Sequence, residues 1–397
     1  MMTPNPFLCS TTERPVHVAH GAGPYANTRQ ALAPIDLSAV RGLRVLLKPN
    51  VGRVARPGSG VTTHPEVVAA AIDAFREAGA EVALGESPIA GVRLEEAIEA
   101  TGMAAVARGR SCPCIDMDRR EAVERPVPAG QVLHSLTLCP EVLEYDLIVS
   151  IPVMKTHMHT GVTLAVKNMK GCLWRRSKVA LHMLPPMEGS DQKSLDVAIA
   201  DMSSILRPDL AIVDGTVGME GLGPGAGQAK PVDAVVVSPD AFAADAVACR
   251  LMGLRAEEVP HLRIGAQRGY GVIDLDRLGV TPGHWAQWTV PFAPPPRNLQ
   301  IEFPNVRVLD NNSCSACQST LLLFLSRYHD RLFDYFPAEG PLSIAIGSGH
   351  TELPEGTLCI GNCTARHRGK GPFVPGCPPV GTEILAALTG KPPEQER

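Results

Sequence analysis

The sequence predicts an α/β fold: a mostly parallel sheet with helices on both faces, followed by a smaller cysteine-rich α/β module. Short apolar runs alternate with segments of helical apolar period along most of the chain. The chain has 397 residues, and hydrophobic residues make up 45% of it, which is enough for a substantial core. Five of its eleven cysteines follow residue 305, in a stretch rich in glycine and proline.

The first strand–helix–strand unit lies near the N-terminus. Gly42–Val51 is an apolar run that ends in Lys-Pro-Asn and is typical of a buried strand. Thr63–Ala80 has a capping start, a helical period and a glycine near its end, and Glu81–Ser87 is the next strand. The same alternation predicts helices at 94–109, 195–206 and 240–253, and strands at 145–155, 208–218 and 233–239.

Three regions of different composition follow one another along the chain. Residues 1–278 are expected to form the α/β domain. Residues 279–305 are rich in proline and hold two of the three tryptophans, which predicts a linker or packing arm. Residues 306–397 are expected to form the cysteine-rich module, with a helix at 319–336 and a strand at 342–348.

Composition excludes several classes of function. Aromatic residues are only 4% and the formal net charge is −4, so we expect no nucleic-acid partner. No apolar run is long enough to span a bilayer, and the N-terminus lacks the pattern of a secretory signal, so we expect a cytoplasmic protein without a membrane partner. In that reducing compartment, clustered cysteines indicate metal or redox chemistry rather than disulfides.

The cysteines of the last region favour a metal centre. Cys314 and Cys317 form a C-x-x-C pair before a predicted helix, and Cys359, Cys363 and Cys377 lie in a glycine- and proline-rich loop. Structural zinc usually takes two C-x-x-C pairs. Here the second group is wider, which favours one [4Fe–4S] cluster. Zinc, and structural cysteines without a ligand, remain the alternatives.

The same spacing resembles the ligand set of the proximal cluster in hydrogenase small subunits: C-x-x-C, then Gly-Asn-Cys, then Gly-Cys-Pro-Pro. This resemblance covers only a few residues. It implies that the cluster ligands are Cys314, Cys317, Cys363 and Cys377. Cys359 is then a fifth thiol and the alternative ligand.

The densest polar stretch is Ile151–Lys178, where a predicted strand runs into lysines and histidines. Ligands of open α/β sheets bind outside the carboxyl ends of the strands. Several lysines at such an edge repel one another unless an anion lies between them, so we expect a crevice that binds a phosphate or carboxylate. Alternatively, the lysines pair with Asp214 or Glu220. The expected binding residues are Lys48, Asn50, Lys167, Asn168 and Lys170, and the expected catalytic residues are Lys155, His157 and Asp214.

Several of these segments together resemble the DUF362 family, whose function is unassigned. The resemblance covers Val16–Leu275 and rests on the Lys-Thr-His and Val-Lys-Asn-x-Lys-Gly elements at 155–157 and 166–171. Many members of that family join this domain to an iron–sulfur module with C-x₂-C-x₂-C-x₃-C-P runs. The present chain lacks those runs, so the resemblance implies one cluster and a redox role but no particular substrate.

These observations predict an iron–sulfur oxidoreductase that passes electrons to an anionic small molecule or cofactor in the crevice. The expected electron donor is a ferredoxin or flavodoxin. A non-catalytic electron-transfer or metallocentre-maturation protein is the alternative. A hydrolase or transferase with a structural metal ranks behind both, because neither G-x-S-x-G nor H-E-x-x-H occurs.

Overall fold

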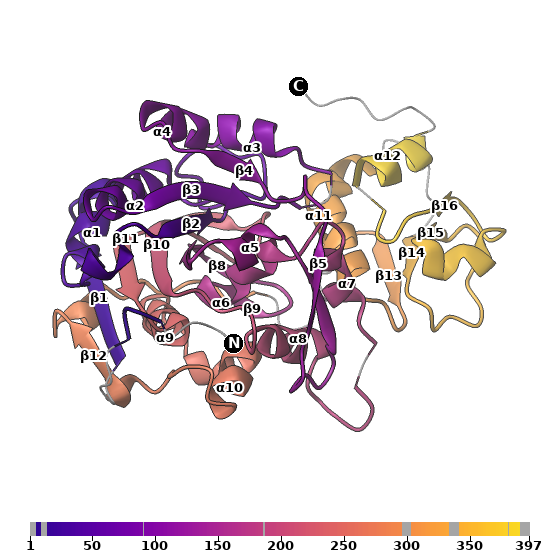
Figure 1. Cartoon of the computed structure of the whole chain (residues 1–397). Coiled ribbons are helices and arrows are strands. Elements are labelled where there is room, and N and C mark those ends of the chain that lie inside the picture. The colour runs from indigo at the N-terminus through magenta and orange to yellow at the C-terminus, as the bar shows by residue number, and fades with distance from the viewer. Residues whose placement is uncertain are drawn as a thin grey trace. The chain divides into compact units, whose positions relative to one another are not determined.

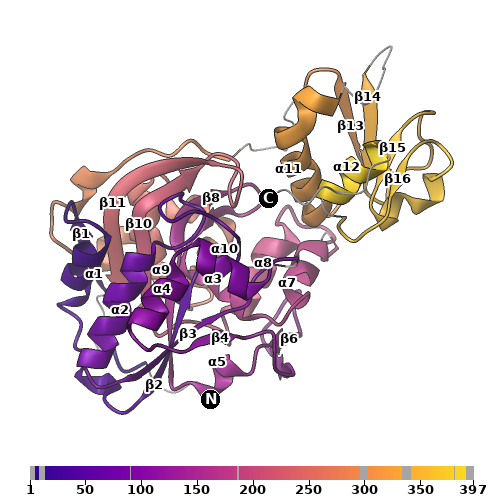
Figure 2. The ribbon, with the colours of Figure 1, turned by 90° about the horizontal axis from the view of Figure 1, so that it is seen from above.

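The structure is a computed structural model that describes residues 5–8, 14–89, 91–185, 187–295, 303–332, 341–379 and 381–389. The chain folds into two compact units (Figures 1 and 2). The first comprises Met1–Leu181 and Pro186–Pro295, and the second comprises His182–Pro185 and Pro296–Arg397.

A mixed, mostly parallel sheet forms the centre of the first unit, which confirms the predicted fold class. Its main strands lie in the order β12-β1-β11-β10-β7-β2-β3-β4, and β8 and β9 pair beside β10. The strands are β1 (Arg14–His20), β2 (Arg44–Pro49), β3 (Glu81–Glu86), β4 (Cys114–Asp116), β7 (Leu147–Ile151), β8 (Val153–His157), β9 (Gly161–Thr163), β10 (Leu210–Glu220), β11 (Gln228–Ser238) and β12 (Leu278–Thr281). A separate hairpin joins β5 (Val123–Pro126) to β6 (Ser135–Leu138).

Helices cover both faces of this sheet (Figure 1). The apolar side chains of α1, α2 and α4 pack with alternate residues of the central strands in one large core cluster. On the other face, α9 packs against β10 and β11, and α6 packs against α9. The helices of this unit are α1 (Pro24–Leu32), α2 (Pro65–Glu77), α3 (Leu94–Ala100), α4 (Met103–Gly109), α5 (Glu141–Glu144), α6 (Ala165–Asn168), α7 (Ser177–Ala180), α8 (Ser194–Met202), α9 (Ala241–Leu251) and α10 (Pro260–Gln267).

The first strand–helix–strand unit has the predicted elements β2, α2 and β3. The ring of His64 caps α2 by accepting a hydrogen bond from the backbone N–H of Glu66, and Pro65 occupies the first turn. The helix ends before Gly79, whose φ of 91° suits glycine. The two strands pair in parallel, so their polar carboxyl ends lie side by side.

Several predicted elements have different bounds in the structure, and three of these differences change the course of the chain. The strand expected at 145–155 is two strands, β7 and β8, because Pro152 interrupts it and β8 turns to pair with β10 and β9. The helix expected at 94–109 breaks into α3 and α4 at Gly102, which has a φ of 78°. The strand expected at 208–218 continues to Glu220 and forms a long antiparallel hairpin with β11.

Residues 278–295 are part of the first unit and contact its sheet. β12 pairs in parallel with β1, and Phe292 is 5% exposed. The phenyl ring lies where a side chain on Gly218 would stand, 2.7 Å from the ideal Cβ position. Residues 296–302, in the second half of the expected linker, lie outside the described residues.

The second unit is a small parallel sheet with two helices. Its strands lie in the order β13 (Val306–Asp310), β14 (Leu342–Ile346), β15 (Leu358–Ile360) and β16 (Phe373–Val374). The helices are α11 (Ser315–Leu332) and α12 (Gly381–Thr389). The helix expected at 319–336 therefore begins four residues earlier, and its expected end lies outside the described residues. In the parts of both units that the structure describes, no helix is long and apolar enough to cross a membrane.

Candidate functional site

Lys48, at the end of β2, forms a buried ion pair with Glu86, at the end of β3. The lysine Nζ lies 2.9 Å from Glu86 Oε1, and the two side chains are 1% and 5% exposed. The carboxylate also accepts hydrogen bonds from the backbone N–H groups of Val51 and Ser87. Gly171 leaves room for this pair, since a Cβ there would stand 2.6 Å from Lys48 Nζ.

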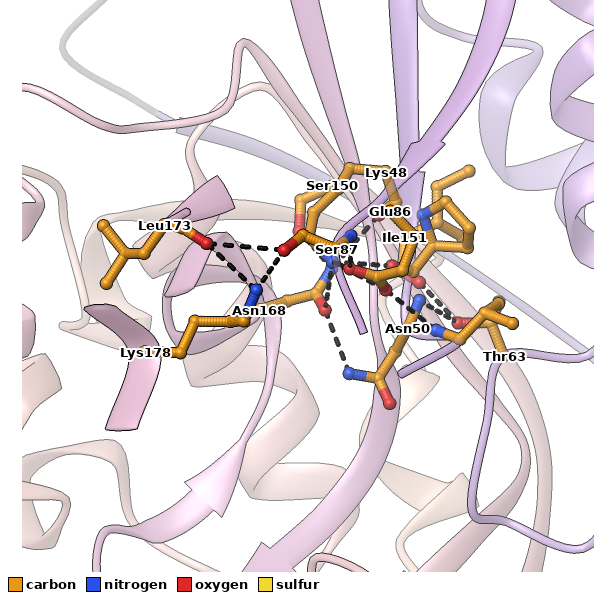
Figure 3. A network of polar contacts seen from close by, with 12 residues as sticks. Lys48, Asn50, Thr63, Glu86, Ser87, Ser150, Ile151, Asn168, Leu173 and Lys178 are labelled. Atoms are coloured by element: carbon orange, nitrogen blue, oxygen red, sulfur yellow. Dashed lines mark hydrogen bonds and ion pairs between the residues drawn. The ribbon is translucent and has the colours of Figure 1, made fainter. Parts of the chain in front are cut away.

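Two asparagines connect this pair to the neighbouring strands (Figure 3). Asn168 accepts hydrogen bonds through Oδ1 from Lys48 Nζ and Asn50 Nδ2, at 3.3 and 3.1 Å. Its own Nδ2 donates to the carbonyl of Lys48 and to the hydroxyl of Ser150. The end of β2, the end of β7 and helix α6 are therefore held together by side-chain amides.

Lys155, on β8, also reaches Asn50. Its Nζ donates to Asn50 Oδ1 at 2.9 Å, to the carbonyl of Val61 at 2.8 Å and to that of Pro224 at 3.5 Å. All three acceptors are uncharged, and the side chain is 2% exposed. Burial therefore lowers the pKa of Lys155 well below its ordinary value, and the positive charge of Arg53 lowers it further.

Two more lysines follow on α6 and the turn after it. Lys167 is 7% exposed, and burial lowers its pKa to about 7, although Asp196 opposes this effect. Burial likewise lowers the pKa of Lys170, and the charge of Lys167 adds to this shift. Neither ammonium has a hydrogen-bond partner among the described residues. We call Lys48, Lys155, Lys167, Lys170, Asn50 and Asn168 the lysine site.

With all of its lysines protonated, the lysine site would carry more positive charge than the neighbouring carboxylates balance. Of its lysines, Lys48 has a carboxylate in hydrogen-bond contact, and that carboxylate is Glu86. Asp214 and Glu220, the partners that we considered from the sequence, are engaged elsewhere: Asp214 with His64 and Thr216, and Glu220 with Lys230. The arrangement therefore suits an anion.

The two other expected catalytic residues have defined local roles. The Nδ1 atom of His157 accepts a hydrogen bond from the backbone N–H of His159, which leaves the ring proton on Nε2 when the ring is neutral. Asp214 accepts from the backbone N–H of His64 at 2.7 Å and from Thr216, so it joins the start of α2 to β10. Burial raises the pKa of Asp214.

We expected Lys155 and His157 at the open rim of a crevice, but both are buried. The loop Gly221–Gly227 between β10 and β11 packs on β8. The carbonyl of Gly223 accepts a hydrogen bond from the N–H of Met158, and a Cβ on Gly223 would collide with the carbonyl of Thr156. Glycine is therefore required where the loop covers the strand, and Lys155 and His157 are enclosed rather than exposed.

Cys314 and Cys317, in the second unit, lie at the start of α11. Their sulfurs share a hydrogen bond, and backbone N–H groups of the first helical turn point at Cys314; both effects lower the pKa of Cys314 to about 6. The same contact raises the pKa of Cys317, as do burial and the charges of Cys363 and Cys377. The three other thiols that we expected to be ligands therefore all act on Cys317 through their charge. We call these four cysteines the thiol site.

Two glycine loops bring Cys363 and Cys377 to this place. Asn362 ties the loops together, because its N–H donates to the carbonyl of Gly376 and its Oδ1 accepts from the N–H of Gly376, at 2.9 and 2.8 Å. Gly361 has a φ of 88°, and a Cβ there would lie 3.3 Å from the sulfur of Cys317. The loops can approach the C-x-x-C pair so closely only because glycine stands at this position.

Cys359 does not lie with the thiol site. It alternates along β15 with Leu358 and Ile360, which pack in the same cluster as Cys317. Cys359 instead packs in a separate cluster with Ala345 and Leu353, and its sulfur donates to the carbonyls of Thr357 and His367. The alternation of side chains along a strand therefore points this thiol to the opposite face of the sheet.

Zinc and a [4Fe–4S] cluster place different demands on four thiols. One zinc ion holds its sulfurs at about 2.3 Å, so four sulfurs must converge on a single point. Among the described residues, no three Cys, His, Asp or Glu side chains converge in that way. In a [4Fe–4S] cluster each thiolate binds a different iron, so the sulfurs stand farther apart around a larger body. In the thiol site, the sulfurs of Cys314 and Cys317 are in hydrogen-bond contact, and the charges of Cys363 and Cys377 act on Cys317.

Some residues around the lysine site were not expected from the sequence. Glu86 ends an apolar strand and gave no signal of its own, although its place at the strand end could have suggested it. Arg53 follows β2 in an irregular loop and acts on both Lys155 and Lys167. Asp196 lies within a predicted helix and His261 within α10, a helix that was not predicted. The packing of α8 against α10 brings the two residues together.

Comparison with known proteins agrees with the sequence motifs. Residues 45–250 match the family described as "Domain of unknown function (DUF362)". The "Thylakoid-associated protein sll1697" of Synechocystis sp. (strain ATCC 27184 / PCC 6803 / Kazusa) is 31% identical over 262 residues, which are 66% of this chain and 75% of that protein.

A solved structure also resembles the chain: the lactate racemase apoprotein from Thermoanaerobacterium thermosaccharolyticum. Its TM-score is 0.42 at 13% identity, and the match covers 61% of this chain and 57% of the racemase chain. The family match spans more than half of the present chain and includes β2, β7, β8 and α6, which supply the lysine site. The chain therefore belongs to the DUF362 family.

Proposed function

We propose that this protein is an iron–sulfur oxidoreductase that reduces an anionic small molecule or cofactor bound at the lysine site. The observation that supports the proposal is that the loop of Gly361 approaches the sulfur of Cys317, and that the charges of Cys363 and Cys377 act on that thiol although both are distant from it in the sequence. When bound, a [4Fe–4S] cluster supplies one-electron transfer. Zinc in the same thiols is the alternative occupant.

The residues of the thiol site have the properties that such a cluster needs. The lowered pKa of Cys314, which comes from its hydrogen bond to Cys317 and from backbone N–H groups, favours the thiolate. Cys363 is exposed to solvent. An exposed ligand provides a route for electron exchange with a partner, for which we propose a ferredoxin or flavodoxin.

The lysine site supports binding of an anion. Lys155 and Lys167 are buried without a carboxylate in hydrogen-bond contact, and an anion would offset the cost of charging them. The carboxyl ends of β2 and β7 are also where α/β sheets bind ligands. His157 is the proposed proton donor, through Nε2. A small carboxylate or phosphate ester is the class of substrate that these groups suit.

The first experiment tests the cluster. Protein purified without oxygen should be brown and contain about four iron and four sulfide per chain. Cys317→Ser and Cys363→Ser should lose the colour. Cys359→Ser is the matched control and should keep it, because this thiol faces the other side of the sheet. Colourless wild-type protein with one zinc per chain would replace the redox proposal by a structural zinc site.

The second experiment separates catalysis from an accessory role. The non-catalytic alternative is favoured by the exposed Cys363 alone, since an electron carrier needs no substrate site. Lys155→Gln should abolish reduction of the substrate and leave the iron content unchanged if the lysine site is catalytic. A substrate screen with a chemical reductant should find no turnover in the wild-type protein if it only carries electrons.

A further inference from the structure

Two loops meet at Lys155 in the first unit. One comprises residues 51–62, between β2 and α2, and the other comprises residues 221–227, between β10 and β11. The ammonium of Lys155 donates to the carbonyl of Val61 in the first loop, at 2.8 Å, and to that of Pro224 in the second, at 3.5 Å. A buried cation therefore lies where the two loops come together.

Arg53 brings a second cation to the same place. Its side chain is half-buried and packs against Gly225, whereas the next side chain, Val54, is 55% exposed. A Cβ on Gly225 would stand 3.1 Å from the Cζ and Nε atoms of the guanidinium. Gly225 follows Pro224 directly, so the guanidinium and the ammonium of Lys155 lie within about 10 Å of each other.

The charges of Arg53 and Lys155 repel each other. Burial lowers the pKa of both Lys155 and Lys167, and the charge of Arg53 lowers both values further. The three acceptors that Lys155 contacts are uncharged, so they supply no negative charge to offset this repulsion. An anion between the two cations would offset it.

A guanidinium recognises a particular kind of anion. Its planar fork can donate two parallel hydrogen bonds to two oxygens of one carboxylate, sulfate or phosphate group, whereas an ammonium acts as a point charge. The close contact with Gly225 also limits the positions that the Arg53 side chain can take. A side chain that is already confined loses less freedom when a ligand binds.

We propose that Arg53 is a further anion-binding residue of the lysine site, and that it holds an oxyanion together with Lys155 where the two loops meet. This inference rests on the proposed function, because it needs an anion at the lysine site. It narrows the ligand to anions with at least two terminal oxygens, since a spherical ion such as chloride can use only the charge of the guanidinium. Gly225 belongs to the arrangement because a side chain there would displace the guanidinium.

The test is titration calorimetry with sulfate, at an ionic strength of about 0.15 M set with sodium chloride, which screens distant surface charges. Arg53→Gln should weaken sulfate binding at least about tenfold, because it removes charge-assisted hydrogen bonds. Arg53→Lys keeps the charge but loses the fork, so it should still weaken binding severalfold.

Two further variants sharpen this test. Arg56→Gln removes an exposed guanidinium from the same loop, so it should change sulfate affinity less than about twofold. Gly225→Ala keeps both cations and fills only the space beside Arg53, so it should weaken sulfate binding severalfold. The φ of Gly225 lies outside the left-handed region, so alanine is not strained by φ there.

Chemical modification tests Arg53 in the wild-type protein. Phenylglyoxal reacts with arginine side chains, and mass spectrometry measures the extent of reaction at each of them. Sulfate should slow the reaction at Arg53 severalfold and leave the reaction at Arg56 unchanged. This measurement decides the question if Arg53→Gln does not fold.

The outcomes distinguish this inference from the proposed function. If sulfate fails to bind wild-type protein, the anion site is wrong, and the proposed function with it. If sulfate binds wild-type protein and Arg53→Gln equally well, or protects Arg53 no more than Arg56, the anion site stands and the role of Arg53 is wrong. Wild-type affinity in Arg53→Lys would overturn the contact between the guanidinium fork and the anion.

Discussion

Lys48 and Glu86 end two neighbouring parallel strands and meet as a buried ion pair with an Nζ–Oε1 distance of 2.9 Å. The carboxylate is also held by two backbone N–H groups, and the ammonium by Asn168. Lys48 belongs to the lysine site, so this pair fixes one side of that site at the carboxyl ends of β2 and β3. The two residues are 38 positions apart in the sequence.

Breaking this pair should be costly, because the remaining charge stays buried without its partner. We expect Lys48→Met and Glu86→Gln each to lower the free energy of unfolding by about 3–5 kcal/mol, measured by urea denaturation. The control is Arg29→Met, which removes a pair with Glu77 whose side chains are 35% and 60% exposed. That variant should lose less than about 1 kcal/mol. Equal losses for the two pairs would contradict the buried role of Lys48.

Gly361 should be required for the thiol site. A Cβ at this residue would lie 3.3 Å from the sulfur of Cys317 and would stand on a backbone with a φ of 88°. We expect Gly361→Ala to lower the iron content of anaerobically purified protein severalfold. Gly356→Ala is the matched control, since Gly356 has a φ of 77° and nothing within 4 Å. Full iron loading in both variants would show that the loop does not approach the cluster.

Gly60 should be required for the close approach of the loop after β2 to β10. Its φ is 73°, and a Cβ would lie 2.2 Å from the carbonyl oxygen of Gly218. Gly58, two residues earlier, has a φ of 71° and open space around it. We expect Gly58→Ala to cost about 1–2 kcal/mol of stability from backbone strain alone. Gly60→Ala should lower the stability clearly more than Gly58→Ala does, with both variants measured by thermal denaturation. A similar loss of stability in the two variants would argue against the contact between Gly60 and Gly218.

Asp245 should make stability depend on pH. Burial raises its pKa from 3.8 to about 8, although the backbone N–H groups of Val166 and Ala165 oppose this shift. Between these two pH values the folded protein keeps a proton that the unfolded chain has lost, so the free energy of unfolding falls as pH rises. The slope should be about 1.4 kcal/mol per pH unit, and the contribution should be constant above about pH 8.

The comparison with Asp245→Asn isolates this residue, because asparagine does not titrate. The difference in unfolding free energy between wild-type protein and the variant should narrow or reverse as pH rises from about 4 to about 8. Urea denaturation at several pH values measures it. A difference that stays constant over that range would mean that Asp245 is ionised in the folded protein.

Much of the fold could be predicted because the signals are local. The apolar run before Lys48, the capped helix that starts at Pro65 and the strand that ends at Glu86 each carry their own pattern, and each has nearly the predicted bounds. The errors arose where one residue redirects the chain. Pro152 splits a predicted strand, and Gly102 splits a predicted helix, since each needs a backbone geometry that apolar periodicity does not record.

The sequence predicts candidate residues, but it does not show which contacts they make. The sequence places Lys48, Asn50 and Asn168 near strand ends, and the structure joins them through side-chain amides. It gives no sign that Lys155 is covered by the loop that carries Pro224. Burial depends on segments that are distant in sequence, so the change from an open rim to an enclosed site appears only in three dimensions.

The sequence by itself determined the alternation of strands and helices, the membership in the DUF362 family, and which side chains are polar where the strands end. Only the tertiary structure decided that Glu86 is the partner of Lys48, that Cys359 faces away from the other thiols, and that Asp196 meets His261. The physical reason is that apolar periodicity, from which helices and strands are predicted, depends on residues that are neighbours in the sequence. The partner of a side chain, its exposure to solvent and the shift of its pKa depend instead on which segments, distant in the sequence, pack around it and exclude water.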